Sequence, residues 1–193
     1  MSSTNRGAKR QPNELYETPA ETTLAMLPWL PCWTPRRVLD PCCGSGAILN
    51  ACRAHWPDVE TLGIEIDGPT ADRTIGSPHR VAVGDALSLP WPAVDIAVMN
   101  PPYSLAEQFV RRAREGLPGV TTAVLLRLAF LESAKREPLF EEHGMPDVHV
   151  LAKRPSFMRG ETDSCAYAWM VWGPGRGGRI YRIEGRAAAR KEE

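Results

Sequence analysis

Short apolar runs alternate along the chain with longer segments that have helical character. The first five runs are rich in β-branched or aliphatic residues, as is typical of buried strands: Val38–Leu39, Thr61–Ile66, Arg80–Val83, Val94–Met99 and Val120–Leu126. Strands separated by helical segments favour a parallel sheet with helices on both faces. Two later runs, Val148–Leu151 and Cys165–Trp172, bring the expected strands to seven. The pattern predicts an α/β fold with a seven-stranded, mostly parallel sheet flanked by helices.

Two helix starts are indicated by capping patterns. Thr18-Pro19-Ala20-Glu21 contains an N-cap candidate, a proline for the first turn and an acid three residues after the cap, so a helix is expected through about Leu30. Ser104 and Glu107 form a second capping pattern, and the apolar residues that follow share one helical face: Leu105, Phe109, Val110 and Ala113. The arginines on the same helix should therefore face water or a partner: Arg111, Arg112 and Arg114.

Length and composition favour a single domain. A chain of 193 residues, 43% of them hydrophobic, is long enough for one well-buried core and too short for two ordinary ones. We expect this domain over residues 14–186, between a polar N-terminal tail (1–13) and a charged C-terminal tail (187–193). Lys plus Arg and Asp plus Glu each number 23, so any binding to a polyanion must come from local patches.

The cysteines and the apolar runs exclude several protein classes. Cys32, Cys42, Cys43, Cys52 and Cys165 are odd in number and lack Cys-x-x-Cys spacing, so neither a disulfide framework nor a metal site is expected. The N-terminus lacks an apolar signal core, and no apolar run is long enough to cross a bilayer. We therefore expect a reduced, cytoplasmic protein without a membrane partner.

A glycine-rich turn follows the first expected strand. In Asp40-Pro41-Cys42-Cys43-Gly44-Ser45-Gly46, the two glycines allow the backbone to approach a ligand closely. The third glycine of the dinucleotide pattern Gly-x-Gly-x-x-Gly would fall at Leu49, which disfavours a pyrophosphate cofactor. The turn instead favours a nucleoside joined to an amino acid, although taken alone it is also compatible with an ordinary strand-to-helix turn.

A proline-rich loop follows the fourth expected strand. In Asn100-Pro101-Pro102-Tyr103 the prolines cannot donate backbone hydrogen bonds, and they hold the chain extended with its carbonyls turned outward. Two acceptors, Asn100 Oδ1 and the Pro101 carbonyl, are suited to grip the hydrogens of a planar exocyclic amine and turn its lone pair toward an electrophile. An ordinary proline turn beside a core tyrosine is the alternative for the tetrapeptide alone.

Together these features resemble the S-adenosylmethionine (SAM)-dependent DNA adenine-amino methyltransferases of the Asn-Pro-Pro-Tyr type. The order of Tyr16-Glu17-Thr18-Pro19, glycine turn and proline loop is similar to the gamma order of that family over roughly residues 14–110. Leu126–Glu132 and Arg154–Phe157 resemble late segments of its compact phage or bacterial forms. The resemblance implies a Rossmann-like class I fold, SAM as cofactor with S-adenosylhomocysteine as product, and DNA as substrate.

The resemblance also implies roles for single residues. Asp40 and the glycine turn are expected to hold the methionine part of SAM, Glu65 the ribose, and Asp85 the adenine amino group. Asp67 is an alternative ribose ligand, and each acid is also compatible with simply capping a turn. The implied cofactor-binding residues are Tyr16, Thr18, Pro19, Asp40, Gly44, Gly46, Glu65, Ile66, Asp85, Ala86 and Asn100. The implied catalytic residues are Asn100, Pro101, Pro102 and Tyr103, with Tyr103 stacking on the target ring.

The acceptor is less well defined than the cofactor. RNA and protein-glutamine methyltransferases share the Asn-Pro-Pro-Tyr loop, and a non-catalytic SAM-fold subunit is a further alternative. We see no separate target-recognition domain, so a partner protein or oligomer is expected to contribute recognition. The candidate DNA-facing residues are Lys153, Arg154, Phe157 and Arg159, with solvated charges around a core phenylalanine as the alternative. Arg176, Arg179 and Arg182 either contact phosphates or solubilise the end of the chain. The tryptophans are expected in the core or at an interface, with Trp169 and Trp172 on opposite sheet faces.

Overall fold

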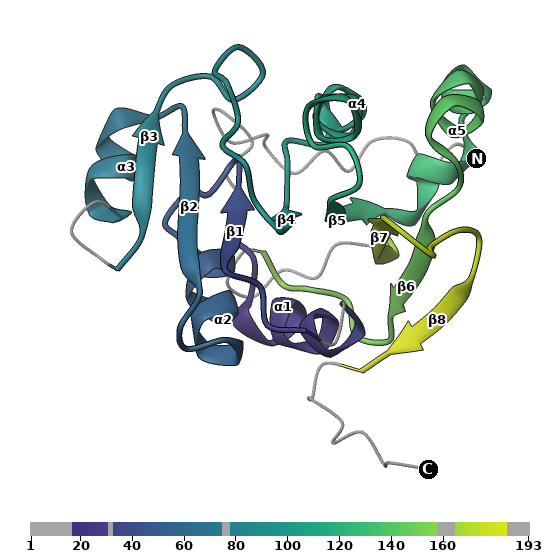
Figure 1. Ribbon diagram of the computed structural model, residues 1–193. Helices are drawn as coiled ribbons and strands as arrows, with labels where there is room; N and C mark the ends of the chain where they lie inside the picture. Colours follow the sequence, from purple (N-terminus) through teal and green to yellow (C-terminus); the bar gives the residue numbers. More distant parts are fainter. Residues whose placement is uncertain (1–16, 31–32, 75–77, 158–164, 185–193) are drawn as a thin grey trace, which may run out of the picture.

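The fold is built on one eight-stranded sheet (Figure 1). The computed structural model describes residues 17–30, 33–74, 78–157 and 165–184. In chain order the strands are β1 (Arg37–Asp40), β2 (Glu60–Glu65), β3 (Arg80–Val83), β4 (Ile96–Met99), β5 (Thr121–Arg127), β6 (Asp147–Leu151), β7 (Tyr167–Trp172) and β8 (Ile180–Ile183). Their spatial order is β3-β2-β1-β4-β5-β7-β6-β8, and only the pairs that involve β7 are antiparallel. A mostly parallel sheet is thereby confirmed.

The described residues form eight strands, one more than the seven predicted from the sequence. β8 pairs in parallel with β6, with Val148 opposite Ile180 and Leu151 opposite Ile183. It is an edge strand of four residues in which only Ile183 is buried, and Ile180 is 76% exposed. Such a strand lacks the continuous apolar run that marks the central strands, so the sequence pattern did not identify it.

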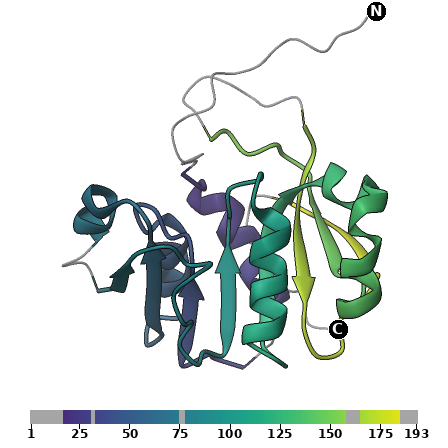
Figure 2. The same cartoon turned by 90° about the horizontal axis from the view of Figure 1, so that it is seen from above.

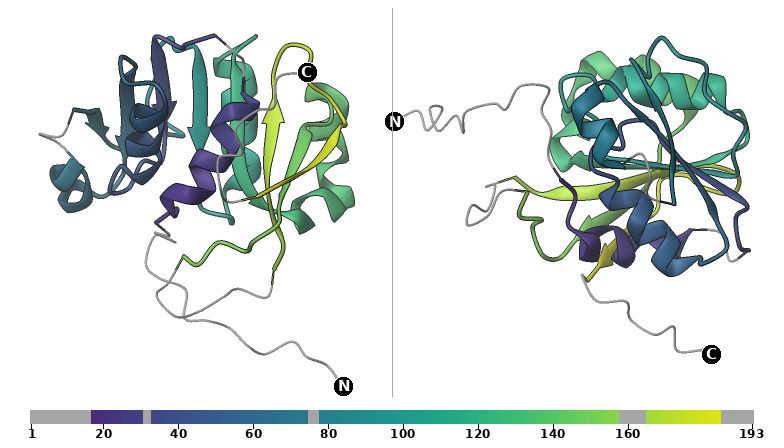
Figure 3. Two further views of the ribbon diagram at one scale, coloured as in Figure 1. Left: turned by 90° about the horizontal axis from the view of Figure 1, so that it is seen from below. Right: turned by 90° about the vertical axis from the view of Figure 1, so that its left-hand side faces the viewer.

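Helices cover both faces of the sheet (Figures 1 and 3). On one face lie α1 (Ala20–Met26), the short helix η2 (Leu27–Trp29) and α2 (Ala47–His55). On the other lie α4 (Ala106–Gly116) and α5 (Glu137–His143), preceded by the 3-10 turns η3 (Leu128–Glu132) and η4 (Ala134–Arg136). Figure 2 shows α4 running along the strands, and α3 (Gly68–Thr74) packs beside β2 and β3. The expected flanking of the sheet by helices is therefore confirmed.

Each face of the sheet has its own apolar core. β-Strand side chains alternate between the faces, so Trp169 packs with the α1 and α2 side and Trp172 with the α4 side. Both are almost fully buried, as expected. Trp29 and Trp33 lie outside the core, since they are 38% and 48% exposed, and an interface role for them stays a prediction.

The capping predictions were wrong in detail. The N-cap of α1 is Pro19 and that of α4 is Leu105, and neither helix has a side-chain cap hydrogen bond. Thr18 lies one residue too early for that role and contacts Asn100 instead. Tertiary contacts thus determine where these helices begin.

The arginines of α4 do not simply face water. Arg111 pairs with Glu107 and with Glu142 of α5, while Arg112 and Arg114 donate to the backbone carbonyls of Leu89 and Val120. Side chains of this length reach neighbouring elements from the rim of a helix. None of the helices within the described residues combines the length and apolar character needed to cross a bilayer.

The order of the strands locates the place where a ligand can bind. The chain runs outward from β1 to β3 and then returns to form β4 beside β1, with Val38 opposite Ile96. A crevice opens outside the carboxyl ends of the strands at such a switch point. Asp40 ends β1 and Asn100 follows β4, so the two predicted motifs meet there.

Candidate active site

A cavity of about 790 Å³ lies at this switch point. It joins the ends of β1, β2, β3 and β4 to the segment that precedes α1. Its lining includes most of the residues predicted to bind cofactor: Thr18, Asp40, Gly44, Glu65, Ile66, Asp85, Ala86 and Asn100. Pro102 and Phe157 line it as well. Five motifs that are distant in sequence therefore share one cavity.

Several predicted residues do not line the cavity, among them Pro101 and Tyr103 of the proline loop. Pro19 is the N-cap of α1 and Gly46 is the N-cap of α2, and both lie outside the lining. Lys153 and Arg154 are exposed and lie outside the lining. Tyr16 and Arg159 fall outside the described residues.

The glycine turn is held in place by Glu65. The backbone N–H of Gly44 donates to Glu65 Oε2 over 2.8 Å, and the N–H of Asp67 donates to Oε1 over 2.8 Å. Gly44 and Gly46 have φ angles of 51° and 84°, a left-handed conformation that favours glycine. A Cβ at Gly46 would also lie 3.0 Å from Thr74 Cγ2. Glu65 therefore shapes the turn, and each of its oxygens keeps further acceptor capacity toward the cavity.

Asp40 is a buried acid at the base of the cavity. Only 1% of the residue is exposed, and Oδ1 accepts hydrogen bonds from Cys42 N at 3.1 Å and Cys42 Sγ at 3.5 Å. Burial raises the pKa of Asp40 to about 7, and the nearby Glu65 acts in the same direction, against the two hydrogen bonds from Cys42. A cationic ligand in the cavity would favour the ionised carboxylate.

Asp85 starts a turn and lines the cavity at the same time. Its carboxylate accepts hydrogen bonds from Leu87 N at 2.9 Å and from Ser88 Oγ at 3.0 Å. The turn-forming alternative is therefore realised. Next to it, Ile66 and Ala86 add apolar surface to the lining, with Ile66 60% exposed.

The proline loop carries Asn100 into the cavity. Its Nδ2 donates to Thr18 Oγ1 over 3.0 Å, and the remaining polar atom of the amide, Oδ1, is an acceptor. The carbonyl of Pro102 accepts from Leu105 N at 2.9 Å, which ties the loop to the start of α4. The loop contains no cis peptide bond. Two acceptors predicted from the sequence, Asn100 Oδ1 and the Pro101 carbonyl, thus belong to a loop anchored at both ends.

An aromatic group adjoins the catalytic loop. The Tyr103 ring lies 5.8 Å from Tyr167, and the Phe157 ring lies 5.2 Å from Tyr167. The Arg127 guanidinium lies 5.1 Å from the centre of the Tyr103 ring, and its Nε donates to Tyr167 Oη over 3.2 Å. The cation and the rings thus form one connected set that includes Tyr103 of the proline loop.

Some residues of the site were not found from the sequence. Glu17, Cys42, Ser45, Thr70 and Arg73 line the cavity, and Arg127 and Tyr167 support Tyr103. Glu17, Cys42 and Ser45 lie inside motifs that the sequence analysis recognised, so their place in those motifs could have identified them as site residues. Arg127 lies in the segment Leu126–Glu132, for which the sequence indicated no role, and only the register of β5 against β7 brings it beside Tyr167.

The arginines near the C-terminus serve the fold. Arg176 and Arg179 lie 3.5 and 3.1 Å from the fully buried carboxylate of Asp147, and Arg182 pairs with Glu184. Arg176 also donates to the carbonyl of Trp29. Arg176 and Arg179 thus neutralise a buried acid, a role that the sequence did not reveal, and the expected contact with phosphates stays a prediction.

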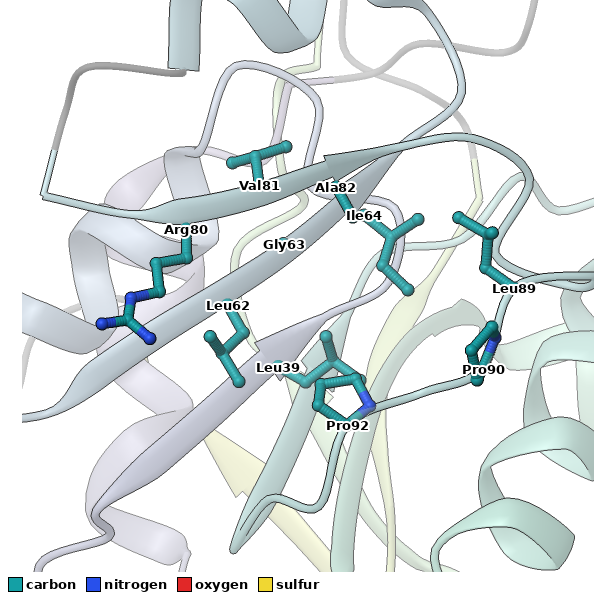
Figure 4. Close-up of a pocket in the computed structure, with 10 residues that line it drawn as sticks. All are labelled: Leu39, Leu62, Gly63, Ile64, Arg80, Val81, Ala82, Leu89, Pro90 and Pro92. Carbon is teal, nitrogen blue, oxygen red and sulfur yellow. The ribbon is translucent and has the colours of Figure 1, made fainter.

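A second, smaller hollow of about 330 Å³ lies beside β1, β2 and β3 (Figure 4). Its lining is apolar except for Arg80: Leu39, Leu62, Gly63, Ile64, Arg80, Val81, Ala82, Leu89, Pro90 and Pro92. It offers no acid or amide to a reacting group, so the larger cavity is the candidate active site.

Comparisons with known proteins agree with this geometry. No protein-family model matches the sequence. The chain is 27% identical over 99 residues to the type II methyltransferase M.CvrRI of Paramecium bursaria Chlorella virus XZ-6E, a match over 49% of this chain and 26% of the viral protein. The chain thus spans about a quarter of the length of this relative.

Solved structures share the fold at low identity. The methyltransferase subunit of a type I restriction-modification system from Streptococcus thermophilus has a TM-score of 0.65 at 20% identity, covering 88% of this chain and 47% of the subunit. A candidate RNA methyltransferase from Pyrococcus horikoshii has a TM-score of 0.68 at 20% identity, covering 91% of this chain and 94% of that protein. The chain therefore has the class I SAM-dependent methyltransferase fold, and its similarity to SAM-dependent DNA methyltransferases is confirmed by the viral type II relative.

Proposed function

We propose that the protein transfers a methyl group from SAM to the exocyclic amino group of adenine in DNA. The observation that carries this proposal is the position of Asn100. Its amide lines the same cavity as Asp40, Glu65 and Asp85, the acids at the ends of the three preceding strands. The cavity thus holds an acceptor suited to a target amine. Beside it lie groups suited to a nucleoside that carries a cationic amino acid.

The chemistry of the lining fits SAM. Asp40 is a buried acid that a cationic ligand would hold ionised, Glu65 and Asp67 offer acceptors for ribose hydroxyls, and Ile66 and Ala86 offer apolar surface for a base. The left-handed glycines keep side chains away from the turn. When bound, SAM supplies a methyl group on a sulfonium ion that is open to in-line displacement.

The protein contributes position and electrostatics. Asn100 Oδ1 and the Pro101 carbonyl accept hydrogen bonds from the target amine, turn its lone pair toward the methyl group and stabilise positive charge as it develops on the nitrogen. In ideal cases alignment of two reactants lowers a barrier by ~7–11 kcal/mol, which exceeds the effect of a single general base. Positioning is therefore the main catalytic term at this site.

The aromatic residues favour a nucleobase over a glutamine side chain. Phe157 lines the cavity, while Tyr103, three residues after Asn100 in the same loop, lies outside the lining and contacts Arg127 and Tyr167. Stacking on aromatic rings contributes roughly 1–3 kcal/mol per base, which offsets the few kcal/mol needed to unstack a base from a duplex. A linear amide would gain much less from these rings.

The viral type II relative and the restriction-modification subunit support DNA as the acceptor. The likeness to the candidate RNA methyltransferase from Pyrococcus horikoshii makes RNA the alternative acceptor. Because the Streptococcus thermophilus protein is a subunit of a restriction-modification system, a partner supplying target recognition is part of the proposal.

The test is transfer of labelled methyl from SAM to unmethylated DNA, to RNA of the same sequence and to a glutamine-containing peptide. We expect label in DNA, and none with the Asn100→Ala variant. Label confined to RNA or peptide would refute the proposed acceptor, and SAM binding without transfer to any acceptor would favour a non-catalytic subunit.

A further inference from the structure

The segment before α1 joins the two halves of the candidate active site. Glu17 Oε1 accepts a hydrogen bond from Ser45 Oγ in the glycine turn over 2.8 Å. The next residue, Thr18, accepts from Asn100 Nδ2 in the catalytic loop over 3.0 Å. Thr18 is only 4% exposed, and 82 positions separate it from Asn100 along the chain. Two neighbouring residues therefore connect loops that belong to different strands.

We propose that Thr18 is a positioning residue for methyl transfer, which holds the Asn100 amide with Nδ2 toward its hydroxyl and Oδ1 toward the target amine. This inference rests on the proposed function for its catalytic consequence. The sequence assigned Thr18 only to the cofactor site and to a helix cap, and the structure gives it no capping bond.

The two ends of an amide explain why this contact matters. A target amine is a donor, so it is bound productively by Oδ1 and repelled by Nδ2. With Oδ1 facing the amine, Nδ2 points the other way, toward the buried Thr18 side chain, and needs an acceptor there. Thr18 Oγ1 supplies that acceptor, so the productive orientation leaves this half-buried donor satisfied. A threonine hydroxyl also donates, but only its acceptor lone pairs serve this arrangement.

The chain offers variants that isolate this contact. Thr18→Val removes the hydroxyl at nearly constant shape, and Thr18→Ser retains it. The matched control is Thr23→Val in α1, where the same change is made at a fully buried threonine. Thr23 Oγ1 has no hydrogen-bond partner among the described residues and lies outside the cavity lining, so its loss should leave transfer unchanged.

The first readout is the single-turnover rate of methyl transfer to DNA at saturating SAM, beside the SAM dissociation constant from calorimetry. A buried donor without its acceptor disfavours the productive orientation, so Thr18→Val should lower the rate roughly 10- to 100-fold. The SAM dissociation constant should change by less than about threefold, since the loss falls on the reacting group. Thr18→Ser should restore most of the rate. An unchanged rate, or a loss found wholly in SAM affinity, would overturn the inference.

The second readout does not depend on turnover. The chain contains four asparagines, Asn5, Asn13, Asn50 and Asn100, so selective ¹⁵N labelling of asparagine gives four side-chain amide pairs in an NMR spectrum. The Asn100 pair is the one lost in Asn100→Ala. The resonances of this pair should shift in Thr18→Val. They should stay near their wild-type positions in Thr18→Ser and in Thr23→Val. If the resonances of the Asn100 pair do not shift in Thr18→Val, the positioning role is refuted. If they shift while no acceptor is methylated, the proposed function is wrong and the contact between Thr18 and Asn100 is still confirmed.

Discussion

The buried acid Asp40 makes the stability of the protein depend on pH in an unusual direction. The perturbation is Asp40→Asn, which keeps the shape of the side chain and removes its titration. Burial raises the pKa of Asp40 from 3.8 to about 7. Since one pH unit corresponds to about 1.4 kcal/mol, the ionised carboxylate costs the folded state roughly 4 kcal/mol.

The sign follows from proton binding in the two states. In the unfolded chain Asp40 ionises near its usual pKa of 3.8, whereas in the folded protein without ligand it keeps its proton until about pH 7. Between these values the folded state binds more protons, so the contribution of Asp40 to stability falls as pH rises and is constant above pH 7. The amide that replaces the carboxyl group in Asp40→Asn is neutral throughout, so the variant has no such dependence at this position.

The assay is urea unfolding of both proteins between about pH 4 and pH 8.5, with the difference in unfolding free energy as the measured quantity. This difference cancels the titration of the other acids. It should change in favour of Asp40→Asn by up to roughly 4 kcal/mol across the range. A difference that stays constant with pH would refute the argument. In the same buffers SAM should bind wild type more tightly as pH rises through 7, and calorimetry should find Asp40→Asn weaker and nearly independent of pH.

Three further substitutions test other parts of the account. Gly46→Ala places a side chain at φ 84°, so urea unfolding should show a loss of about 1–2 kcal/mol, and an unaltered midpoint would argue against the left-handed turn. Asp147→Asn removes the charge that Arg176 and Arg179 neutralise, and both arginines reach solvent, so thermal and urea unfolding should show a loss of about 1–3 kcal/mol, whereas wild-type stability would show that these ion pairs contribute nothing. Phe157→Ala should weaken productive DNA binding by roughly 1–3 kcal/mol without changing SAM affinity, as read from the DNA concentration dependence of transfer; an equal loss in SAM affinity would place Phe157 with the cofactor.

The sequence was sufficient for the parts of the fold that depend on local pattern. Continuous apolar runs identified the central strands because both faces of a parallel sheet are buried. The glycine turn and the proline loop met in one cavity because β1 and β4 are neighbours at the switch point, a property of the fold class. Their order along the chain was enough to place Asp40 and Asn100 together.

The features that were missed depend on long-range contacts. β8 is half exposed and has no apolar run, so only its register against β6 reveals it. Thr18 looked like a cap because the local residues fit a capping pattern, but Asn100 binds its hydroxyl. Arg179 looked like a solvated charge because its partner Asp147 lies 32 residues away on a neighbouring strand. Local sequence carries no information on such pairings.

The proposed role of Asn100, to direct methyl transfer to the adenine amino group of DNA, is tested most directly by nucleoside mass spectrometry. DNA is incubated with SAM and either wild type or Asn100→Ala before the nucleosides are analysed. We expect N6-methyladenine with wild type and none with the variant, while calorimetry finds SAM bound to both. Methyl groups on another base, or undiminished N6-methyladenine with Asn100→Ala, would contradict this role.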